Sequence, residues 1–338
     1  MTRHLTVLRA GPGLSVQDQG RVGFLAYGLS RGGAVDRVAL AEGAALLQQS
    51  PECAAIEMAG MGGEFTASDD MRIALTGAQM QARIGDQSLR WNASHLLPKG
   101  AVLTIGAAVC GSYGYLHLGG GVESALQLGA RSSHLAAGIG GLLEAGQSLP
   151  IGVDTTELTG QGLRPLPRMG GGTVRMVASL QTHLFNNVLQ VFENTSFTRD
   201  VRGNRMGVKM ASDGPGFALD GALSVLSEVI APGDIQITGD GAPFVLLAEC
   251  QTTGGYPRIG TVLPCDLPRV VQARPGESLK FHFVSEQEAL EAERRHRADL
   301  AALPNALYPL IRDPHDIGDL LSYQLISGAI AGTEEDMP

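Results

Sequence analysis

The chain has 338 residues, of which 44% are hydrophobic and 17% are charged, as in a globular protein rather than a disordered one. Its formal net charge of -9 argues against a nucleic-acid-binding protein, whose surface carries clustered Lys and Arg residues. No apolar run approaches the roughly 20 residues that cross a bilayer, and the apolar stretch at the N-terminus is too short for a secretory signal. We therefore expect a cytoplasmic protein that binds neither nucleic acid nor a membrane.

Short apolar segments separated by Gly, Pro and Asp residues predict that most of the chain forms β-strands. The 46 glycines are about twice the usual share of roughly 7%, and they supply tight turns. Gly85-Asp86 and Asp240-Gly241 predict two hairpin turns. The expected strands include residues 71–77, 101–108, 113–120, 174–180, 244–250 and 279–285. Because the crossover helices of a parallel sheet are missing, we expect a mainly β protein with closed or sandwiched sheets.

Three helices are expected among these strands, at residues 36–48, 182–190 and 286–303. Ser285 and Glu288 form the capping box that begins the third helix, and its thin apolar face predicts that it lies on the surface. A further apolar helix is expected near residues 317–330.

Composition along the chain predicts four regions. Residues 1–152 and 174–285 are each expected to form a β domain, and the polar, Pro- and Gly-rich residues 153–173 a linker between them. Residues 286–338 are expected to form the C-terminal helix and a tail.

The cysteines and histidines show no pattern of a metal site. Cys53, Cys110, Cys250 and Cys265 have neither CxxC spacing nor a His partner at zinc-like intervals, so we expect four free thiols and no metal. His117 and His134 lie closest to glycine-rich loops, and a structural role is favoured for both.

The first segment with candidate binding residues is the glycine-punctuated loop 11–37. Gln17, Asp18 and Arg21 offer donors and acceptors there, and the glycines let the backbone approach a ligand closely. The alternative is that Asp18 and Arg21 pair to hold the loop onto the next strand.

The second segment is GNRMG, residues 203–207. Arg205 lies between two glycines, where a guanidinium is able to bind a carboxylate or phosphate with two hydrogen bonds. The alternative is a surface turn with a solvated arginine.

The third segment, residues 248–262, is the most informative. Gln251, Thr252 and Thr253 place an amide and two hydroxyls directly after an apolar strand, and Tyr256 adds a phenol. The pair Gly254-Gly255 is able to expose successive N–H groups as an anion-binding nest. This set suits a small amide, a carboxylate or an oxyanion, whereas a plain tight turn would need only the glycines.

Several other chemistries lack their motifs in this chain. There is no phosphate-binding GxxxxGK[ST] loop, no dinucleotide-binding GxGxxG motif and no GxSxG nucleophile elbow. A lysine between two methionines, the usual site of biotin attachment, is also missing, so we expect no covalent biotin on this chain.

A set of motifs in a characteristic order and spacing resembles the family of the C subunit of 5-oxoprolinase. This family is also called allophanate hydrolase subunit 2, or biotin-dependent carboxyltransferase-like. The resemblance covers about residues 5–300, and QTTGGYP is its most specific element. The motifs are VQDQGR (16–21), GGAVD (32–36), LTGA (75–78), GARSSHLAAGIGGL (129–142), GNRMG (203–207), LSEVIAPGDIQI (226–237) and QTTGGYPRI (251–259).

The resemblance implies a fold of two cyclophilin-like β-barrel domains with a few short helices. It also implies a site shared with a sister subunit of the allophanate hydrolase subunit 1 type. Carried over by position, it implies catalytic roles for Arg205, Gln251 and Asp18. The substrate-binding residues implied in the same way are Gln17, Arg21, Thr252, Thr253, Gly254, Gly255 and Tyr256. His134 stands where relatives commonly have an Asp, and such departures from the family pattern mean that the resemblance does not identify the substrate.

Three functions follow from the resemblance. The first is a role in an ATP-dependent 5-oxoprolinase, an amide-bond hydrolase that opens 5-oxo-L-proline to L-glutamate together with its A and B subunits, with ATP and Mg bound alongside those partners. The second is a carboxyltransferase subunit that moves a carboxyl group from biotin to urea or a similar small amide. The third is a non-enzymatic regulator of the sister subunit. The first two require that the loops at Gln17, Arg205 and Gln251 meet in one pocket.

Overall fold

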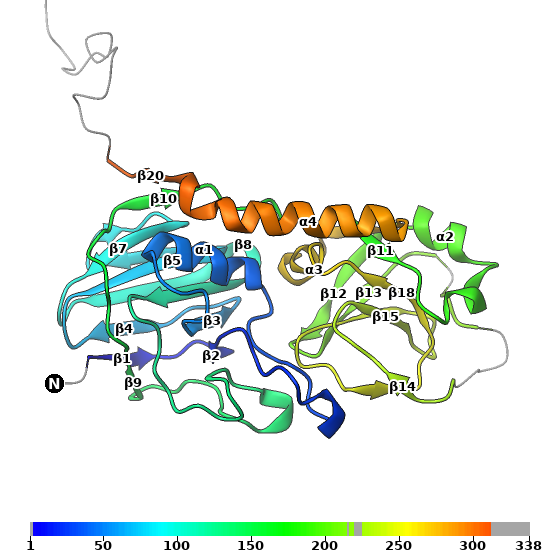
Figure 1. Cartoon of the computed structure of the whole chain (residues 1–338), viewed down its shortest axis with the longest axis horizontal. Coiled ribbons are helices and arrows are strands. Elements are labelled where there is room, and N and C mark those ends of the chain that lie inside the picture. The colour runs from blue at the N-terminus through cyan, green and yellow to red at the C-terminus, as the bar shows by residue number, and fades with distance from the viewer. Residues whose placement is uncertain (1–2, 215, 220–224, 312–338) are drawn as a thin grey trace, which may run out of the picture.

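The computed structural model describes residues 3–214, 216–219 and 225–311 of the chain (Figure 1). It consists of two β units, one built mainly from the first half of the chain and one from the second, with a long helix along one side of both. The mainly β prediction is confirmed. The helix expected near 317–330 lies outside the described residues.

The first β unit is an 11-stranded sheet that carries one α-helix. The sheet runs in the order β20-β10-β7-β5-β8-β4-β1-β9, with β2, β3 and β6 joined beside this path. Its elements are β1 (His4–Arg9), β2 (Leu14–Gln17), α1 (Arg37–Leu47), β3 (Ala55–Ala59), β4 (Glu64–Ala67), β5 (Met71–Ile84), β6 (Gln87–Ser88), β7 (Ala93–Leu97), β8 (Val102–Leu118), β9 (Ser148–Pro150) and β10 (Gln161–Leu163).

Strands β5 and β8 form the long central pair of this unit. The two strands expected at 101–108 and 113–120 are one continuous strand, β8, whose pairing with β5 is irregular around Gly77. Gly77 has a φ of +72°, and a Cβ there would lie 2.5 Å from the Tyr113 carbonyl oxygen. Strand β8 is continuous through residues 109–112, so the expected interruption there is absent, and the pairing with β5 is kept by shifts in register.

The second β unit is a closed seven-stranded barrel in the order β11-β18-β15-β16-β13-β12-β19. Among the described strands of this barrel, only β11 and β19 form a parallel pair. Phe192, Phe197, Phe217 and Phe281 pack together inside this unit, with ring centroids 4.9–5.7 Å apart. The elements are β11 (Gly172–Val177), α2 (Leu189–Asn194), β12 (Phe197–Asn204), β13 (Gly207–Ala211), β14 (Glu228–Val229), β15 (Asp234–Ile237), β16 (Pro243–Leu246), β17 (Thr253–Gly254), β18 (Arg258–Val262), α3 (Leu267–Gln272) and β19 (Ser278–Phe283).

Local signals located the hairpins and two of the three helices. The turns at Gly85-Asp86 and Asp240-Gly241 connect β5 to β6 and β15 to β16. Asp36 caps α1 by accepting from the Ala39 N–H, and Ser285 and Glu288 form the expected capping box. The helix expected at 182–190 is instead a short 3-10 turn, Thr182–Phe185, followed by α2.

The C-terminal segment joins the two units. Helix α4 (Glu286–Ala302) follows the barrel strand β19 and runs along both units, as Figure 1 shows in orange. After it, β20 (Leu307–Pro309) pairs with β10, which itself pairs with β7 of the first sheet. Residues 153–173, expected to be a linker, thus contribute a strand to the first sheet.

Candidate functional site

Arg205 lies at the contact between the two β units. It occupies the turn between β12 and β13, and its side chain extends to the first unit. Nε donates to Glu249 Oε1 at 2.5 Å, Nη2 donates to the Gly33 carbonyl at 2.5 Å, and Nη1 pairs with Glu57. Arg205 is 8% exposed, so it is not the solvated arginine of a surface turn. The expectation of a guanidinium open to a ligand is also corrected, because all three nitrogens have protein acceptors.

The contact continues from Glu57 through Tyr115 to the first helix. The Tyr115 hydroxyl donates to Glu57 Oε2 at 2.6 Å and accepts from the Asp36 backbone N–H at 2.9 Å. Burial, followed by the charge of Glu57, raises the pKa of the Tyr115 phenol well above its ordinary value. The phenol therefore stays protonated and donates to the Glu57 carboxylate.

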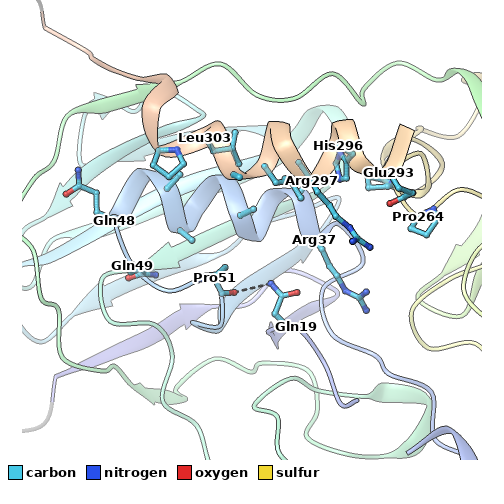
Figure 2. Close-up of a pocket in the computed structure, with 18 of the residues that line it drawn as sticks. Gln19, Arg37, Gln48, Gln49, Pro51, Pro264, Glu293, His296, Arg297 and Leu303 are labelled. Carbon is cyan, nitrogen blue, oxygen red and sulfur yellow. Dashed lines mark hydrogen bonds between the residues drawn. The ribbon is translucent and has the colours of Figure 1, made fainter. Parts of the chain in front are cut away.

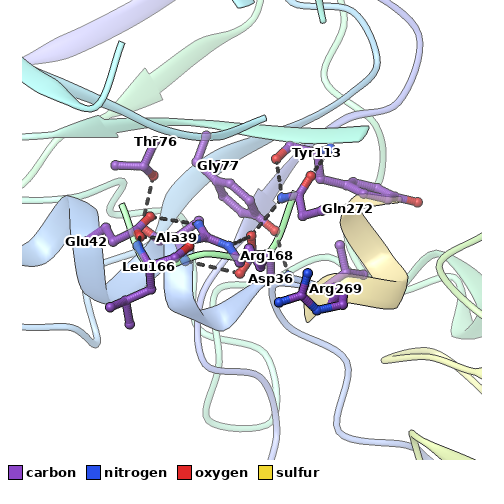
Figure 3. Close-up of polar contacts among 12 residues, drawn as sticks. Asp36, Ala39, Glu42, Thr76, Gly77, Tyr113, Leu166, Arg168, Arg269 and Gln272 are labelled. Carbon is purple, nitrogen blue, oxygen red and sulfur yellow. Dashed lines mark hydrogen bonds and ion pairs between the residues drawn. The ribbon is translucent and has the colours of Figure 1, made fainter. Parts of the chain in front are cut away.

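Arg168 extends the same network inside the first unit. Figure 3 shows its guanidinium between Asp36 and Glu42, and Gln272 reaching the Asp36 carboxylate from α3. The Arg168 nitrogens lie 2.7 Å from Asp36 Oδ2 and 2.7 Å from Glu42 Oε2. The two carboxylates raise the pKa of Arg168 against the opposing effect of its burial. A buried ion cluster thus anchors a segment that composition alone predicts to be a linker.

The N-terminal candidates bind a neighbouring loop of the chain. Gln17 is fully buried, and its Nε2 donates to Ser15 Oγ at 2.9 Å and to the Ser133 carbonyl at 3.3 Å. Asp18 accepts from the backbone N–H of Gly20 at 2.8 Å and of Arg131 at 2.6 Å.

Arg21 binds the same loop and does not pair with Asp18. Its side chain donates to the Gln127 carbonyl at 3.0 Å and to the Ser132 carbonyl at 2.5 Å. No ion pair joins Asp18 and Arg21 among the described residues, so the alternative of a direct pair between them is wrong. Both side chains instead hold the loop 127–133 against the segment 17–21.

His134 belongs to the adjoining turn and is neutral. Its Nδ1 accepts from the Ala137 backbone N–H at 3.2 Å, which leaves Nε2 to donate to Ser30 Oγ at 2.9 Å. Burial, as the largest cause, lowers the pKa of His134. The Nδ1 atom is 3.9 Å from Glu249 Oε2, but a ring nitrogen that accepts a hydrogen bond carries no proton and forms no ion pair with that carboxylate.

The three sequence motifs therefore meet, but their side chains do not share one pocket. The Gly32 N–H donates to the Ala248 carbonyl at 3.0 Å, and the Ala136 N–H donates to Glu249 Oε2 at 2.9 Å. These contacts bring the loops near Gln17, Arg205 and Gln251 together at the junction of the units. Among the three named residues, only Gln251 lines the pocket described next.

A cavity of about 340 Å³ lies beside the QTTGGY segment; we call it the Gln251 pocket. It contains no charged side chain, and it combines amide, hydroxyl and phenol groups with apolar ones. Its wall is formed by Asn204, Met206, Ile230, Gln236, Thr238, Phe244, Leu246, Cys250, Gln251, Gly254, Gly255 and Tyr256. Gln251 is exposed and Tyr256 is 52% exposed, so the pocket is open to solvent on their side.

Gln236 provides a free donor in this pocket. It projects from β15, is 7% exposed, and its buried Nε2 has no hydrogen-bond partner among the described residues. A Cβ at Gly254 would lie 2.5 Å from this nitrogen, so glycine is needed there to leave the Gln236 amide in place. An unpaired buried donor costs about 1–3 kcal/mol, which a ligand acceptor would offset.

The two glycines do not form the expected nest. Gly254 is part of β17 and pairs with Glu228 of β14, and neither Gly254 nor Gly255 has a left-handed φ. A nest requires alternating helical conformations, which a strand excludes. Thr253 is exposed and Thr252 is half-buried, and neither lines the pocket.

Cys250 places a thiol in the pocket, and its surroundings argue against covalent chemistry. Burial, as the first cause, raises the pKa of this thiol to about 12. The thiol is therefore protonated at neutral pH and a poor nucleophile. The pocket is better suited to binding than to covalent attack.

Sequence reasoning missed most of the buried network. Glu57, Glu249 and Gln272 each interrupt an otherwise apolar run, and a lone polar residue in such a run was the available signal. Arg168 gave no such signal in the sequence.

Among the described residues, no group of His, Cys, Asp and Glu has the arrangement of a metal site, and none of the described helices is long and apolar enough to cross a membrane.

Residues 27–283 match the family model described as carboxyltransferase domain, subdomain A and B. The chain is 32% identical to the C subunit of 5-oxoprolinase from Haemophilus influenzae, over 83% of this chain and 92% of that protein. The corresponding protein of Escherichia coli is 33% identical, over 86% of this chain and 94% of that protein.

Two solved structures have similar folds. The crystal structure of TTHA0988 has a TM-score of 0.76 and 28% identity over 84% of this chain, which spans 56% of that protein. The urea amidolyase of Kluyveromyces lactis has a TM-score of 0.79 at 20% identity over 92% of this chain, which spans 21% of that much longer protein. The chain thus belongs to the family of the carboxyltransferase domain, subdomains A and B, which includes the C subunit of 5-oxoprolinase.

Proposed function

We propose that this chain is the C subunit of an ATP-dependent 5-oxoprolinase, which opens 5-oxo-L-proline to L-glutamate together with its A and B subunits. The observation that carries the proposal is the match to the C subunit of 5-oxoprolinase from two bacteria, which extends over more than nine-tenths of those relatives. The urea amidolyases match this chain over only a fifth or less of their own length.

The Gln251 pocket supports the proposal by its chemistry. The lactam of 5-oxoproline presents a carbonyl acceptor and an N–H donor. The unpaired Gln236 Nε2 suits the carbonyl, and the Gln251 side chain has both a donor and an acceptor for the ring amide. About 340 Å³ is ample for a five-membered ring with one substituent.

The pocket does not fit ATP. No charged residue lines it, whereas bound triphosphate and the substrate carboxylate both need cationic partners. In the proposed enzyme, the partner subunits bind ATP and Mg and complete the site over the open side at Gln251 and Tyr256. Arg205 acts there as a positioning residue, because its ion pairs hold the 248–251 segment against the first unit.

The test is a reconstitution with the partner subunits. The purified chain is mixed with the A and B subunits, and glutamate release is measured with and without ATP. We expect turnover that requires ATP and all three proteins.

Gln236→Leu should raise KM for 5-oxoproline about tenfold, as expected for one lost hydrogen bond. Gln79→Leu, which changes an exposed glutamine of β5, should not. Turnover without this chain, or an unchanged KM in Gln236→Leu, would refute the proposal.

The alternative of carboxyl transfer is favoured by one observation, the carboxyltransferase description of the matching family model. The ureido groups of urea and biotin are also neutral, and the uncharged pocket suits them. Urea-dependent decarboxylation of carboxybiotin by the same protein mixture, without glutamate release, would select this alternative. A stable complex without either turnover would select the regulatory one.

A further inference from the structure

Another cavity lies away from the Gln251 pocket, between helices α1 and α4. Its volume is about 960 Å³ (Figure 2). We call it the α1–α4 groove. Its base is aliphatic, with Ala41 and Ala44 on α1, Leu300 near the end of α4 and Leu303 just after it, and no Phe, Tyr or Trp side chain lines it. The family model ends at residue 283, so the α4 wall lies outside the region that the model matches.

Positive charge exceeds negative charge in the wall of this groove, where three arginines face one glutamate. Figure 2 shows the guanidinium groups of Arg37 and Arg297 at the same end, and Arg31 also lines the wall. None of these three arginines forms an ion pair within the part of the chain that the structure describes. Glu293 is the acidic residue of the wall, and its Oε1 already accepts from the Cys265 N–H at 2.7 Å.

Arg37 is the clearest of these unpaired groups. Its Nη2 makes one long hydrogen bond, 3.3 Å to the Gly32 carbonyl, and its buried Nε has no partner among the described residues. Burial, and then repulsion from Arg31, lower the pKa of Arg37 to about 10. A desolvated guanidinium beside a like charge is unfavourable unless an anion binds it.

We propose that the α1–α4 groove binds an amphipathic anion, with a carboxylate or phosphate at Arg37 and an aliphatic body along the base. The anion would supply the negative charge that Arg31, Arg37 and Arg297 lack within the described chain, and this places its head group at their end. The Ala and Leu side chains offer dispersion contacts and no polar group, which suits a saturated chain better than a sugar or a base.

The test is calorimetric titration of the full chain with decanoate, decyl phosphate and decanol. We expect both anions to bind at least tenfold more tightly than decanol, and the tighter of the two identifies the preferred head group. Arg37→Met should weaken binding of both anions about tenfold and leave decanol unaffected. Arg294→Met, which changes an exposed arginine of α4 outside the groove lining, should change nothing.

A second pair of variants tests the location. Ala301 is exposed and lines the groove, whereas Ala298 is exposed on the same helix outside the lining. Ala301→Trp should block binding of the anions, and Ala298→Trp should not. Equal binding of decanol and decanoate, or equal binding by Arg37→Met and the unaltered chain, would overturn the proposal.

Discussion

Arg205 of the barrel and Glu57 of the N-terminal sheet form an ion pair whose side chains are only 9% and 1% exposed. They lie 148 residues apart in sequence. The pair, together with Glu249, joins the loop before the QTTGGY segment to the first unit. The position of the Gln251 pocket relative to the rest of the chain therefore depends on buried charges that do not themselves line it.

Arg205→Met should destabilise the chain severely. It would leave Glu57 and Glu249 buried without their cation, and breaking a buried pair from one side costs about 3–5 kcal/mol. Urea denaturation checks this expectation. Arg202→Met in the adjoining strand β12 is the control, because the Arg202 side chain is 69% exposed and the loss of its pair with Asp200 should leave the midpoint nearly unchanged. Equal midpoints for the two variants would mean that the cluster does not stabilise the junction.

Two buried glutamines should respond differently to the same substitution. Gln272→Leu would remove one hydrogen bond from Asp36 and take the Gln272 amide from the backbone groups of residues 112 and 113, and should cost about 1–3 kcal/mol or more. Gln236→Leu removes an amide whose Nε2 has no partner, and should leave the free energy of unfolding unchanged or raise it. Denaturation curves of both variants decide this. Destabilisation by Gln236→Leu as large as by Gln272→Leu would show that the Gln236 amide has a partner.

Gly43→Ala should destabilise helix α1 although alanine favours helices. A Cβ at this position would lie 2.3 Å from three atoms of the His117 ring, which is itself buried on β8. Overpacking of about 1–3 kcal/mol should exceed the gain of roughly 1 kcal/mol in helix propensity. Gly239→Ala is the control, because its Cβ would meet nothing within 4 Å. Thermal denaturation in which Gly43→Ala matches or exceeds the unaltered chain would contradict the close contact.

His117 should make the chain lose stability in mild acid. Burial lowers its pKa in the folded chain to about 3, from an ordinary value of 6.5. As the pH falls from 6.5 toward 3, the unfolded chain takes up a proton that the folded chain does not, so the free energy of unfolding falls by about 1.4 kcal/mol per pH unit. The stabilisation is complete above pH 6.5.

His117→Gln keeps an amide that is able to bind Thr76 Oγ1, which lies 2.7 Å from the His117 Nε2 atom, but it does not titrate. The stability difference between the two chains should therefore shrink as the pH falls. Urea denaturation of both chains at pH values near 7.5, 6.5 and 5.5, on both sides of the ordinary pKa of histidine, measures this difference in the free energy of unfolding. Parallel pH profiles of the two chains would show that His117 does not cause the loss.

Local patterns in the sequence were sufficient for the elements that depend on near neighbours. Asp36 caps the helix that follows it, Ser285 and Glu288 lie three residues apart, and the two hairpin turns join adjacent strands. The QTTGGY segment also pointed to the pocket, through Gln251, Gly254, Gly255 and Tyr256.

Patterns over a few neighbouring residues do not identify contact partners that are distant in the chain. Arg168 lies in a Pro- and Gly-rich segment that resembles a linker, yet its carboxylate partners are 126 and 132 residues away. The guanidinium of Arg205 looked free in its glycine-flanked turn for the same reason. The conformation expected for Gly254-Gly255 failed because strand β14 pairs with that segment.

The sequence by itself determined the mainly β character and the capped ends of two helices, because alternation of apolar residues and capping act over a few residues. It also determined the family, because the order of the motifs is read directly along the chain. Only the tertiary structure decided which polar groups remain available to a ligand. A buried polar or charged group is costly without a partner, and the folded chain pairs Arg205, Asp18 and Arg21 internally while it leaves Gln236 and Arg37 with unfilled donors.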